Sequence, residues 1–393
     1  MTPRPPSILH VVGLIADRYG GPPRNARDVV AALADRGERV KALTTDRDGR
    51  GRLAASDRRR LGEGREWVVA PVPTFGPALS PAFLRQLRSL IAGADVIHLH
   101  GIYSPATALA GMIARRASVP YVLQLHGAAT DYDYNRKRWK KEPYDVVIQR
   151  RLVAEAYAVI AMSEMEAEQG LRAFPMASMR IVPPPIVDDA AATGPPMRGG
   201  PRTRPGPTVG FLARLNEKKG APILLAAFAR VAAEFPDARL VFAGPDDDGI
   251  GRSMGPDVER LGLGDRVSFP GIVVGADKEA TLAAFDVFAL PSEDESFGIA
   301  VVEAMNAGVP VVITEKVGIV DEIVTAGAGV SAPRSAAGFA SALRNLLADP
   351  AAAAEMGAAG RRLARERYSR SAAVGSLMRV YWDVIAGAGA PVA

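Results

Sequence analysis

An acidic loop that leads into a helix is the first place where this sequence could do chemistry. Residues 291–298 follow an apolar, strand-like run, and the pattern predicts a helix from about Gly298 to Asn306. The first turn of a helix leaves backbone N–H groups unpaired and carries about half a positive charge, which suits a phosphate. Glu295 precedes this helix, and Glu303 lies about 7.5 Å along its axis. The two carboxylates are therefore placed to bind hydroxyls on either side of a diphosphate, although a capping loop with a solvated Glu303 explains the spacing equally well.

A second segment supplies the opposite charge. Arg214 and Lys219 follow the strand-like run 208–212 and precede Gly220, after which a helical pattern begins. Cations at the carboxyl end of a strand can neutralise a diphosphate, and each charge-assisted hydrogen bond contributes about 1.5–3 kcal/mol when desolvated. Taken alone, the two cations are more typical of an exposed basic loop.

The elements that must position these residues are short apolar runs alternating with helical patterns, which is typical of βα units around parallel sheets. The strand-like runs are 8–12, 40–44, 68–72, 96–99, 121–125 and 158–162, and then 208–212, 239–242, 267–269, 287–290 and 309–313. Because these runs are apolar without alternation, helices are expected on both faces of each sheet. A stretch rich in Pro, Gly, Arg and Ala, residues 187–207, separates the two sets and predicts a linker.

Composition narrows the class of protein. A chain of 393 residues with 48% hydrophobic residues fits two domains with their own cores. Cysteine is absent, which excludes disulfides and thiolate metal sites and suits the cytoplasm; the four histidines look too few and too scattered for a zinc cluster. We see no signal-peptide pattern and no apolar run near 18 residues, so a cytoplasmic protein is expected. The net charge of +5 permits an anionic lipid, a phosphorylated substrate or nucleic acid without choosing among them.

Together these segments resemble the retaining glycosyltransferases of family four (glycosyltransferase group 1), which have the GT-B fold. The resemblance rests on the R-L…K-G loop at 214–220, the E-S-F-G…E-A…G-V-P-V block at 295–311, and the stretches 242–245 and 267–271. It covers essentially the second half of the chain. It implies two Rossmann-like, doubly wound domains facing each other across a cleft. An acceptor-binding domain would span 1–186, a linker 187–207 and a nucleotide-sugar donor domain 208–370, with a terminal helix in 371–393 packing back on the first domain.

The resemblance also implies roles for the motif residues. Arg214 and Lys219 would hold the donor pyrophosphate, Glu295 would bind hydroxyls of the donor sugar, and Glu303 would bind the ribose diol. The remaining donor-binding positions are Ser296, Phe297, Gly298 and Ile299 at the helix start and Val273 against the base. The family needs no cofactor and no metal, and its donors include UDP- and GDP-linked sugars. The implied reaction is retaining transfer of a sugar to a hydroxyl acceptor in polysaccharide or glycolipid biosynthesis.

The first half matches the family more loosely. Gly20 and Gly21 follow the first strand, where relatives place a glycine-rich loop near the phosphate and the acceptor. His126, with Gly127, ends the strand 121–125 at the position of the family's active-site histidine. We expect His100 and Gly101 to face the cleft, and His98 to pack on the opposite face.

Two further stretches of the first half bear on the family match. Ser163-Glu164 resembles a motif of the family, but a helix cap explains it as well. Residues 182–185 are V-P-P-P where relatives have V-P-N-G, which puts the acceptor chemistry in doubt.

A basic segment with aromatic residues, 132–141, supplies two further acceptor-side candidates, Tyr132 and Arg136. It suits contact with an anionic membrane at its inner face or with a lipid-diphosphate-linked acceptor. A solvated basic loop is the plainer interpretation, and nothing else in the sequence supports nucleic-acid binding.

Other classes of protein remain to be weighed. The acidic run 246–248 contains D-x-D, the spacing with which metal-dependent sugar transferases hold a divalent ion, although an acidic turn explains it too. A dinucleotide enzyme lacks support because no strand is followed by G-x-G-x-x-G. A nucleotide-sugar epimerase or a non-catalytic sugar-nucleotide-binding protein on the same fold stays open, because a fold alone does not fix a function.

Overall fold

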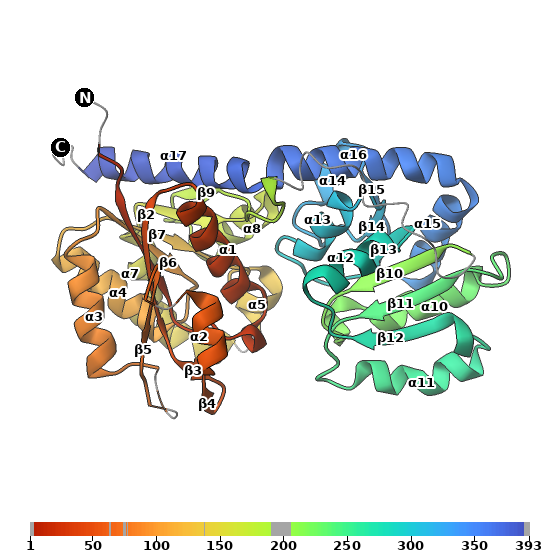
Figure 1. Ribbon diagram of the computed structural model, residues 1–393, viewed down its shortest axis with the longest axis horizontal. Helices are drawn as coiled ribbons and strands as arrows, with labels where there is room; N and C mark the ends of the chain where they lie inside the picture. Colours follow the sequence, from red (N-terminus) through yellow and green to blue (C-terminus); the bar gives the residue numbers. More distant parts are fainter. Residues whose placement is uncertain are drawn as a thin grey trace. The chain divides into compact units, whose positions relative to one another are not determined.

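The computed structural model describes residues 4–62, 64–73, 76, 78–136, 138–189 and 206–388 (Figure 1). They form two compact units, the first made of the chain up to Pro185 together with the chain from Arg370 onward, the second of Ile186–Ser369. Most of the stretch expected to be a linker, residues 190–205, lies outside the described residues.

The first unit is built on a parallel sheet of seven strands in the order β5-β2-β1-β6-β7-β8-β9. Its strands are β1 Ser7–Val12, β2 Arg39–Thr45, β5 Trp67–Ala70, β6 Val96–His100, β7 Tyr121–Gln124, β8 Ala158–Ala161 and β9 Met179–Ile181. Its longer helices are α1 Gly21–Asp35, α2 Ala55–Leu61, α3 Pro81–Ile91, α4 Pro105–Arg116, α6 Arg138–Tyr144, α8 Glu164–Ala173 and α17 Arg370–Ala388. Strands β6, β7 and β8 are buried along their whole length, because helices cover the sheet on both faces.

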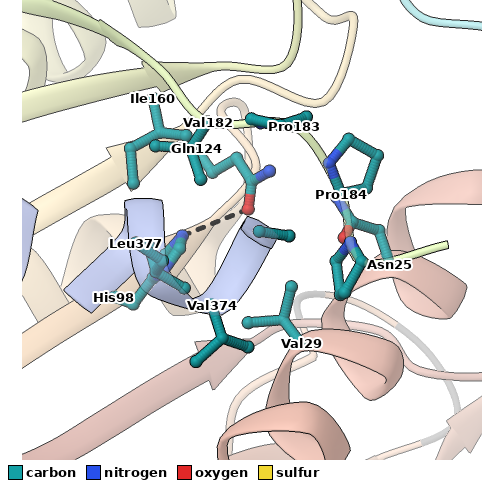
Figure 2. A pocket seen from close by; sticks show the side chains of 12 residues that line it. Asn25, Val29, His98, Gln124, Ile160, Val182, Pro183, Pro184, Val374 and Leu377 are labelled. Carbon is teal, nitrogen blue, oxygen red and sulfur yellow. Dashed lines mark hydrogen bonds between the residues drawn. The ribbon is translucent and has the colours of Figure 1, made fainter. Parts of the chain in front are cut away.

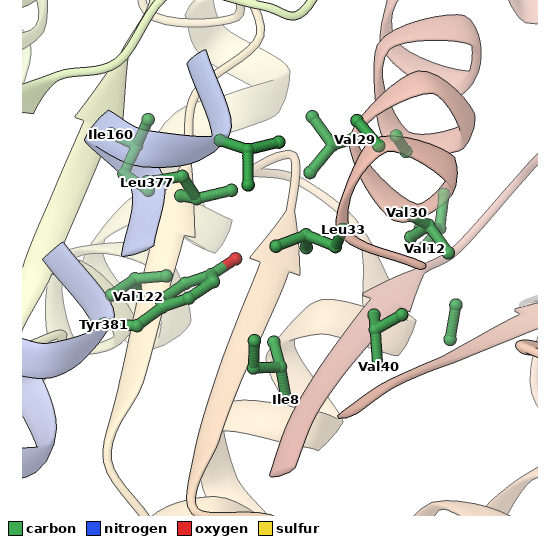
Figure 3. Close-up of a cluster of buried hydrophobic side chains, with 14 of the residues drawn as sticks. Ile8, Val12, Val29, Val30, Leu33, Val40, Val122, Ile160, Leu377 and Tyr381 are labelled. Carbon is green, nitrogen blue, oxygen red and sulfur yellow. The ribbon is translucent and has the colours of Figure 1, made fainter. Parts of the chain in front are cut away.

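The core of the first unit lies in two layers, one on each face of this sheet. One layer joins α1 and α17 to the sheet, and Figure 3 shows Leu377 and Tyr381 of α17 beside Leu33 of α1 and Val122 of β7. The other layer packs α3 and α4 against the opposite face through residues such as Phe83. The last helix of the chain is therefore part of the first unit's core.

The second unit is a parallel sheet of six strands in the order β12-β11-β10-β13-β14-β15. The strands are β10 Thr208–Leu212, β11 Arg239–Ala243, β12 Val267–Gly271, β13 Val287–Leu290, β14 Val311–Ile313 and β15 Gly329–Ser331. Its helices are α10 Ala221–Val231, α11 Ile250–Arg260, α12 Gly275–Ala283, α13 Ile299–Asn306, α14 Val320–Thr325, α15 Ala336–Ala348 and α16 Pro350–Tyr368. Both units are thus doubly wound α/β domains, as the sequence predicts.

The strand orders decide where ligands are expected. In each sheet the chain reverses its direction of growth beside the first strand, between β1 and β6 in the first unit and between β10 and β13 in the second. Ligands of doubly wound sheets bind outside the carboxyl ends of the strands at this reversal. The loops after β1, β6, β10 and β13 are therefore the places to look for a site. Within the described part of the chain, no helix is long and apolar enough to cross a membrane.

Candidate functional site

The loops after β10 and β13 bring two of the sequence-predicted residues into direct contact. The ammonium group of Lys219 donates a hydrogen bond to the Glu295 carboxylate, and both side chains are largely buried. Asn216 caps the short helical turn that carries Lys219, accepting from its backbone N–H at 3.1 Å. At Gly220, which follows with φ 73°, a Cβ atom would lie 2.3 Å from the carbonyl oxygen of Pro291. Glycine at this position therefore lets the two loops approach each other.

The start of α13 is shaped for an anion. Gly298 is the N-cap residue with φ 97°, a conformation that favours glycine, so the helix begins one residue later than predicted. The Phe297 ring is buried edge-on against Tyr368, with ring centroids 5.3 Å apart, and this contact fixes the backbone before the helix. The backbone N–H groups of Val301 and Val302 donate to the Gly298 carbonyl oxygen at 2.9 and 3.2 Å, whereas the N–H groups that precede them at a helix start can bind a phosphate.

Glu303 has a partner that the sequence does not reveal. The Lys278 ammonium, on α12, lies 2.7 Å from a Glu303 carboxylate oxygen, and both side chains are largely buried. The alternative interpretation, a Glu303 side chain on a solvated helix face, is therefore wrong. Lysine on a helix surface has no local signal for such a role, so only the packing of α12 on α13 brings Lys278 to this place.

Two residues of the acidic run 246–248, Asp246 and Asp247, make structural contacts. Asp246 accepts hydrogen bonds from the backbone N–H of Gly251 at 2.8 Å and of Arg252 at 3.1 Å, so it caps α11. Asp247 forms an ion pair with Arg214. Each of the three cations thus faces a carboxylate: Arg214 faces Asp247, Lys219 faces Glu295 and Lys278 faces Glu303. An incoming anion would have to share these cations with the carboxylates or displace the carboxylates from them.

In the first unit, a pocket of about 470 Å³ opens at the carboxyl ends of β1 and β6. Its lining residues are mostly apolar or small and include Val12, Gly13, Tyr19, Pro22, His100, Gly101, Tyr103, Leu125 and His126. Arg47 also lines it and donates a hydrogen bond to the carbonyl oxygen of Gly76 at 2.6 Å. A pocket of this size with a few polar groups is typical of small-molecule sites. Arg47 was missed in the sequence because it stands alone after the second strand.

The four histidines of the chain meet behind this pocket, so the expectation that they are scattered is wrong. His100 Nδ1 lies 2.9 Å from His126 Nε2, and His100 Nε2 lies 2.8 Å from His10 Nδ1. His98 and His100 stack with ring centroids 4.2 Å apart and planes 7° apart. Residues two apart in a strand point to the same face, so the expectation that His98 and His100 face opposite sides is also wrong. Adjacent strands place His10 beside His98 in register.

The histidine cluster ends in polar groups of the core. His98 Nδ1 lies 2.7 Å from the Tyr381 hydroxyl, which is itself 3.3 Å from His10 Nε2. His98 Nε2 lies 3.1 Å from the Gln124 carbonyl oxygen, as Figure 2 shows, beside a cavity of about 10 Å³. Ligating atoms of His10, His98 and His100 all lie within 4.8 Å of one another. One ring nitrogen of His10 contacts His100 and the other contacts the Tyr381 hydroxyl, so both nitrogens of this ring are engaged in hydrogen bonds within the cluster.

Burial keeps these rings neutral. Desolvation lowers the pKa of His10 and of His126 to about 3, and it lowers the pKa of His98 and His100 well below 6.5, helped by the neighbouring histidines. Desolvation likewise raises the pKa of Tyr381 well above 10, so its hydroxyl keeps its proton. The cluster is therefore a set of neutral hydrogen-bonding groups at neutral pH.

The backbone of His126 is held in an uncommon conformation. Its φ is 55°, a backbone angle that residues other than glycine rarely adopt. Gly127 follows with φ 78°. The buried Glu166 carboxylate holds this turn, because it accepts from the backbone N–H of Gly127 and, at 2.7 Å, from that of Met162. Ser163 caps α8 by accepting from the backbone N–H of Glu166 at 3.1 Å. The S-x-x-E spacing at 163–166 is thus the signal that could have found Glu166.

The remaining predicted residues lie apart from these contacts. Gly20 and Gly21 start α1; Gly20 has φ 82°, and a Cβ at either position would meet nothing within 4 Å. The residues that line the pocket do not include Tyr132 or Arg136, which lie on and after α5, Asp131–Asn135. Val273 lies between β12 and α12. Lys137, part of the basic segment, is outside the described residues.

Comparisons with known proteins identify the family. The pattern of the family described as "Glycosyl transferases group 1" matches residues 201–363, and that of the "Glycosyl transferase 4-like domain" matches residues 20–185. A phosphatidyl-myo-inositol mannosyltransferase of Mycolicibacterium smegmatis is 31% identical over 335 residues, covering 82% of this chain and 81% of the relative. A GDP-mannose-dependent alpha-(1-6)-phosphatidylinositol monomannoside mannosyltransferase of the same organism is 29% identical over 75% of this chain and 79% of its own.

Solved structures give the fold. Anabaena Alr3699/HepE in complex with UDP superposes with a TM-score of 0.76 at 19% identity, covering 96% of this chain and 100% of the other. Sucrose-phosphate synthase from Thermosynechococcus elongatus gives a TM-score of 0.74 at 21% identity, covering 97% and 100%. The predicted GT-B fold is confirmed. The chain belongs to the family-four, group 1 glycosyltransferases.

Proposed function

We propose that this glycosyltransferase moves a sugar from a nucleotide-diphosphate sugar to a hydroxyl acceptor with retention of configuration, in polysaccharide or glycolipid biosynthesis. The observation that carries the proposal is the set of paired charges at the carboxyl edge of the second sheet. Lys219 meets Glu295 and Lys278 meets Glu303, on either side of the start of α13. Cations, backbone N–H groups and carboxylates are what a diphosphate between two sets of hydroxyls requires.

In the proposed donor complex, Arg214 and Lys219 bind the pyrophosphate oxygens together with the backbone N–H groups of Phe297 and Gly298. Ser296 and Ile299 flank this anion site. Glu295 accepts hydrogen bonds from the donor sugar and Glu303 from the ribose diol. Val273 lies against the base. Lys219 then bridges the pyrophosphate and Glu295, which couples the sugar's hydroxyl contacts to the leaving group.

In this proposal, fixed charges of the protein stabilise the leaving diphosphate, and no metal ion takes part. The acceptor hydroxyl forms a bond to the anomeric carbon on the face from which the diphosphate departs, and its proton passes to a departing phosphate oxygen. Arg214, Lys219 and the start of α13 offset the charge that develops on the diphosphate. Since Asp246 caps α11, the first carboxylate of the D-x-D run is committed to a contact within the protein.

GDP-mannose is the first donor to test. The relatives named above transfer mannose, and one of them is named as GDP-mannose-dependent, whereas Anabaena HepE is named in complexes with UDP and UDP-glucose. On the acceptor side, the pocket at β1 and β6 offers Arg47 as a cation together with His100, Gly101 and His126. We propose that this pocket binds the acceptor, and that the acceptor carries both the hydroxyl group and an anionic group. Tyr132 and Arg136 are proposed to contact the acceptor outside it.

A membrane contact is proposed for the basic, aromatic stretch. Trp139 is 73% exposed on α6, and Val146 and Val147 are 60% and 73% exposed in the π-helical turn Asp145–Gln149. Exposed Arg136 and Arg150 flank them. Exposed apolar side chains beside cations suit the surface of an anionic bilayer, such as the cytoplasmic leaflet. Trp139→Ala should weaken sedimentation with phosphatidylinositol vesicles several-fold, whereas Trp382→Ala, at another half-exposed tryptophan, should not; equal loss in both variants would refute the contact.

A donor screen tests the proposal most directly. GDP-linked and UDP-linked sugars are compared for the rise in melting temperature that each produces and for the slow hydrolysis that each undergoes. GDP-mannose should raise the melting temperature, and the rise should persist when a chelator is added. NMR of the product should show a linkage with the same anomeric configuration as the donor. Release of a changed sugar without an acceptor would favour an epimerase. Binding without any turnover, with the acceptors of the relatives supplied, would favour a non-catalytic binding protein.

A further inference from the structure

The four histidines and Tyr381 contact each other in one unbranched order. The order runs from His126 through His100 and His10 to Tyr381, then to His98 and Gln124, with successive separations of 2.9, 2.8, 3.3, 2.7 and 3.1 Å. All four rings and Tyr381 lie in the first unit, on β1, β6, α17 and the turn after β7. We define these six residues as the histidine chain.

A neutral imidazole has one donor nitrogen and one acceptor nitrogen, so each ring in the chain has only two choices. The side-chain amide oxygen of Gln124 accepts a hydrogen bond from His98 Nε2, so His98 Nε2 must carry the proton. His98 Nδ1 then accepts from the Tyr381 hydroxyl, and the Tyr381 oxygen accepts from His10 Nε2. His10 Nδ1 accepts from His100 Nε2, and His100 Nδ1 accepts from His126 Nε2. One amide in the core thereby fixes the tautomer of every ring.

The last nitrogen of the chain is left open. His126 Nδ1 is buried and has no hydrogen-bond partner among the described residues, and the His126 ring lines the 470 Å³ pocket. In the tautomer set by the chain, this nitrogen carries no proton and can only accept. A buried acceptor without a partner is costly, and a hydroxyl group of a bound ligand would remove that cost.

We propose that the histidine chain is a positioning device that holds His126 with an unprotonated Nδ1, so that this nitrogen accepts a hydrogen bond from a hydroxyl of the sugar or acceptor bound in the pocket. His10, His98, His100, Gln124 and Tyr381 are positioning residues, because they act through His126. The identity of the ligand rests on the proposed function, whereas the order of proton positions does not. The low pKa values of the rings and the high pKa of Tyr381 agree with a chain of neutral groups.

The test is ¹⁵N NMR of the full-length protein labelled at histidine, which reports the tautomer of each ring. Four sets of ¹⁵N signals are expected, because the chain has four histidines. The set that belongs to His126 should show a protonated Nε2 and an unprotonated Nδ1. Tyr381→Phe removes the link between His10 and His98 while keeping the ring. In this variant His126 should populate both tautomers, and kcat for transfer should fall about five- to tenfold with an unchanged KM for the donor.

Tyr121→Phe is the matched control. Tyr121 is a buried tyrosine of the same unit, and its hydroxyl donates to the Leu152 carbonyl oxygen at 2.7 Å, outside the histidine chain. This variant should be less stable but keep the tautomer of His126. If Tyr381→Phe does not fold, Gln124→Met removes the acceptor at the other end and should also mix the tautomers of His126.

Three outcomes overturn the proposal: a protonated Nδ1 on His126 in the unaltered protein, a tautomer unaffected by Tyr381→Phe and Gln124→Met, or an equal effect of Tyr121→Phe. The proposed function fails separately. Coupled tautomers in a protein that transfers no sugar would refute the transferase assignment and keep the chain, whereas transfer with uncoupled tautomers would refute only the chain.

Discussion

The two units present opposite kinds of polar group at their candidate sites. In the second unit, the loops after β10 and β13 present charged side chains in pairs, such as Lys219 with Glu295, near the start of α13. In the first unit, the pocket after β1 and β6 is backed by neutral imidazoles that bond to one another; those of His10, His98 and His100 are buried and that of His126 is half-buried. Charged pairs bind anions strongly and rearrange when one arrives, whereas a buried neutral chain fixes geometry and protonation in advance.

The largest expected effect comes from removing a charged side chain from the candidate site of the second unit. Arg214→Ala should lower kcat/KM for transfer about a hundredfold, because the charge on the leaving diphosphate loses one partner. Steady-state kinetics with the donor found in the screen measures the loss. Arg344→Ala removes an exposed arginine whose partner is Glu234, and its kinetics should be unchanged. Unimpaired transfer in Arg214→Ala would sink the donor-site assignment.

Acid should distinguish the units next. The folded pKa of His10 and His126 is about 3, below the ordinary 6.5, so the unfolded chain binds more protons between these values. Stability is therefore full above about pH 6.5 and falls as the pH drops toward 3, by up to about 1.4 kcal/mol per pH unit for each such histidine. All four histidines lie in the first unit. Hydrogen exchange at pH 5 should therefore show the first unit opening before the second unit. An equal loss of protection in the two units would contradict this prediction.

A backbone change should weaken the second unit more modestly. Gly220→Ala places a Cβ against the Pro291 carbonyl oxygen at φ 73° and should lower the free energy of unfolding by about 1–3 kcal/mol. The matched control is Gly262→Ala, which has φ 66° but nothing within 4 Å of the added atom. Urea denaturation of both variants separates the cost of the clash from that of the backbone angle. Similar losses in the two would show that the close approach of the loops is unimportant.

The smallest effect tests the acidic run. Asp247→Asn removes the exposed carboxylate that pairs with Arg214, so donor affinity should rise by up to about fivefold, as expected for an exposed ion pair. Calorimetric titration with the nucleotide diphosphate measures the change. A metal-dependent transferase that used Asp246 and Asp248 as ion ligands predicts instead that Asp248→Asn and chelator both abolish binding.

Much of the second unit was predictable from local patterns. Its motifs follow strands β10 and β13 directly, and parallel strands bring their carboxyl ends to one edge, so Lys219 and Glu295 were expected together. Lys278 was not, since its contact with Glu303 depends on how α12 packs on α13. The short strands β9, Met179–Ile181, and β15, Gly329–Ser331, were also missed, because three residues at a sheet edge carry too little pattern.

The sequence by itself determined two doubly wound domains and the charged loops of the second unit, since apolar runs and motif spacing are local properties. Only the tertiary structure decided the histidine chain. His10, His98 and His126 are far apart in sequence, and they meet because β1, β6 and β7 are neighbours in the sheet and residues two apart in β6 share a face. Tyr381 joins them from the end of the chain because the apolar stripe of α17 packs on that same sheet. Such contacts depend on strand order and register, which no local pattern encodes.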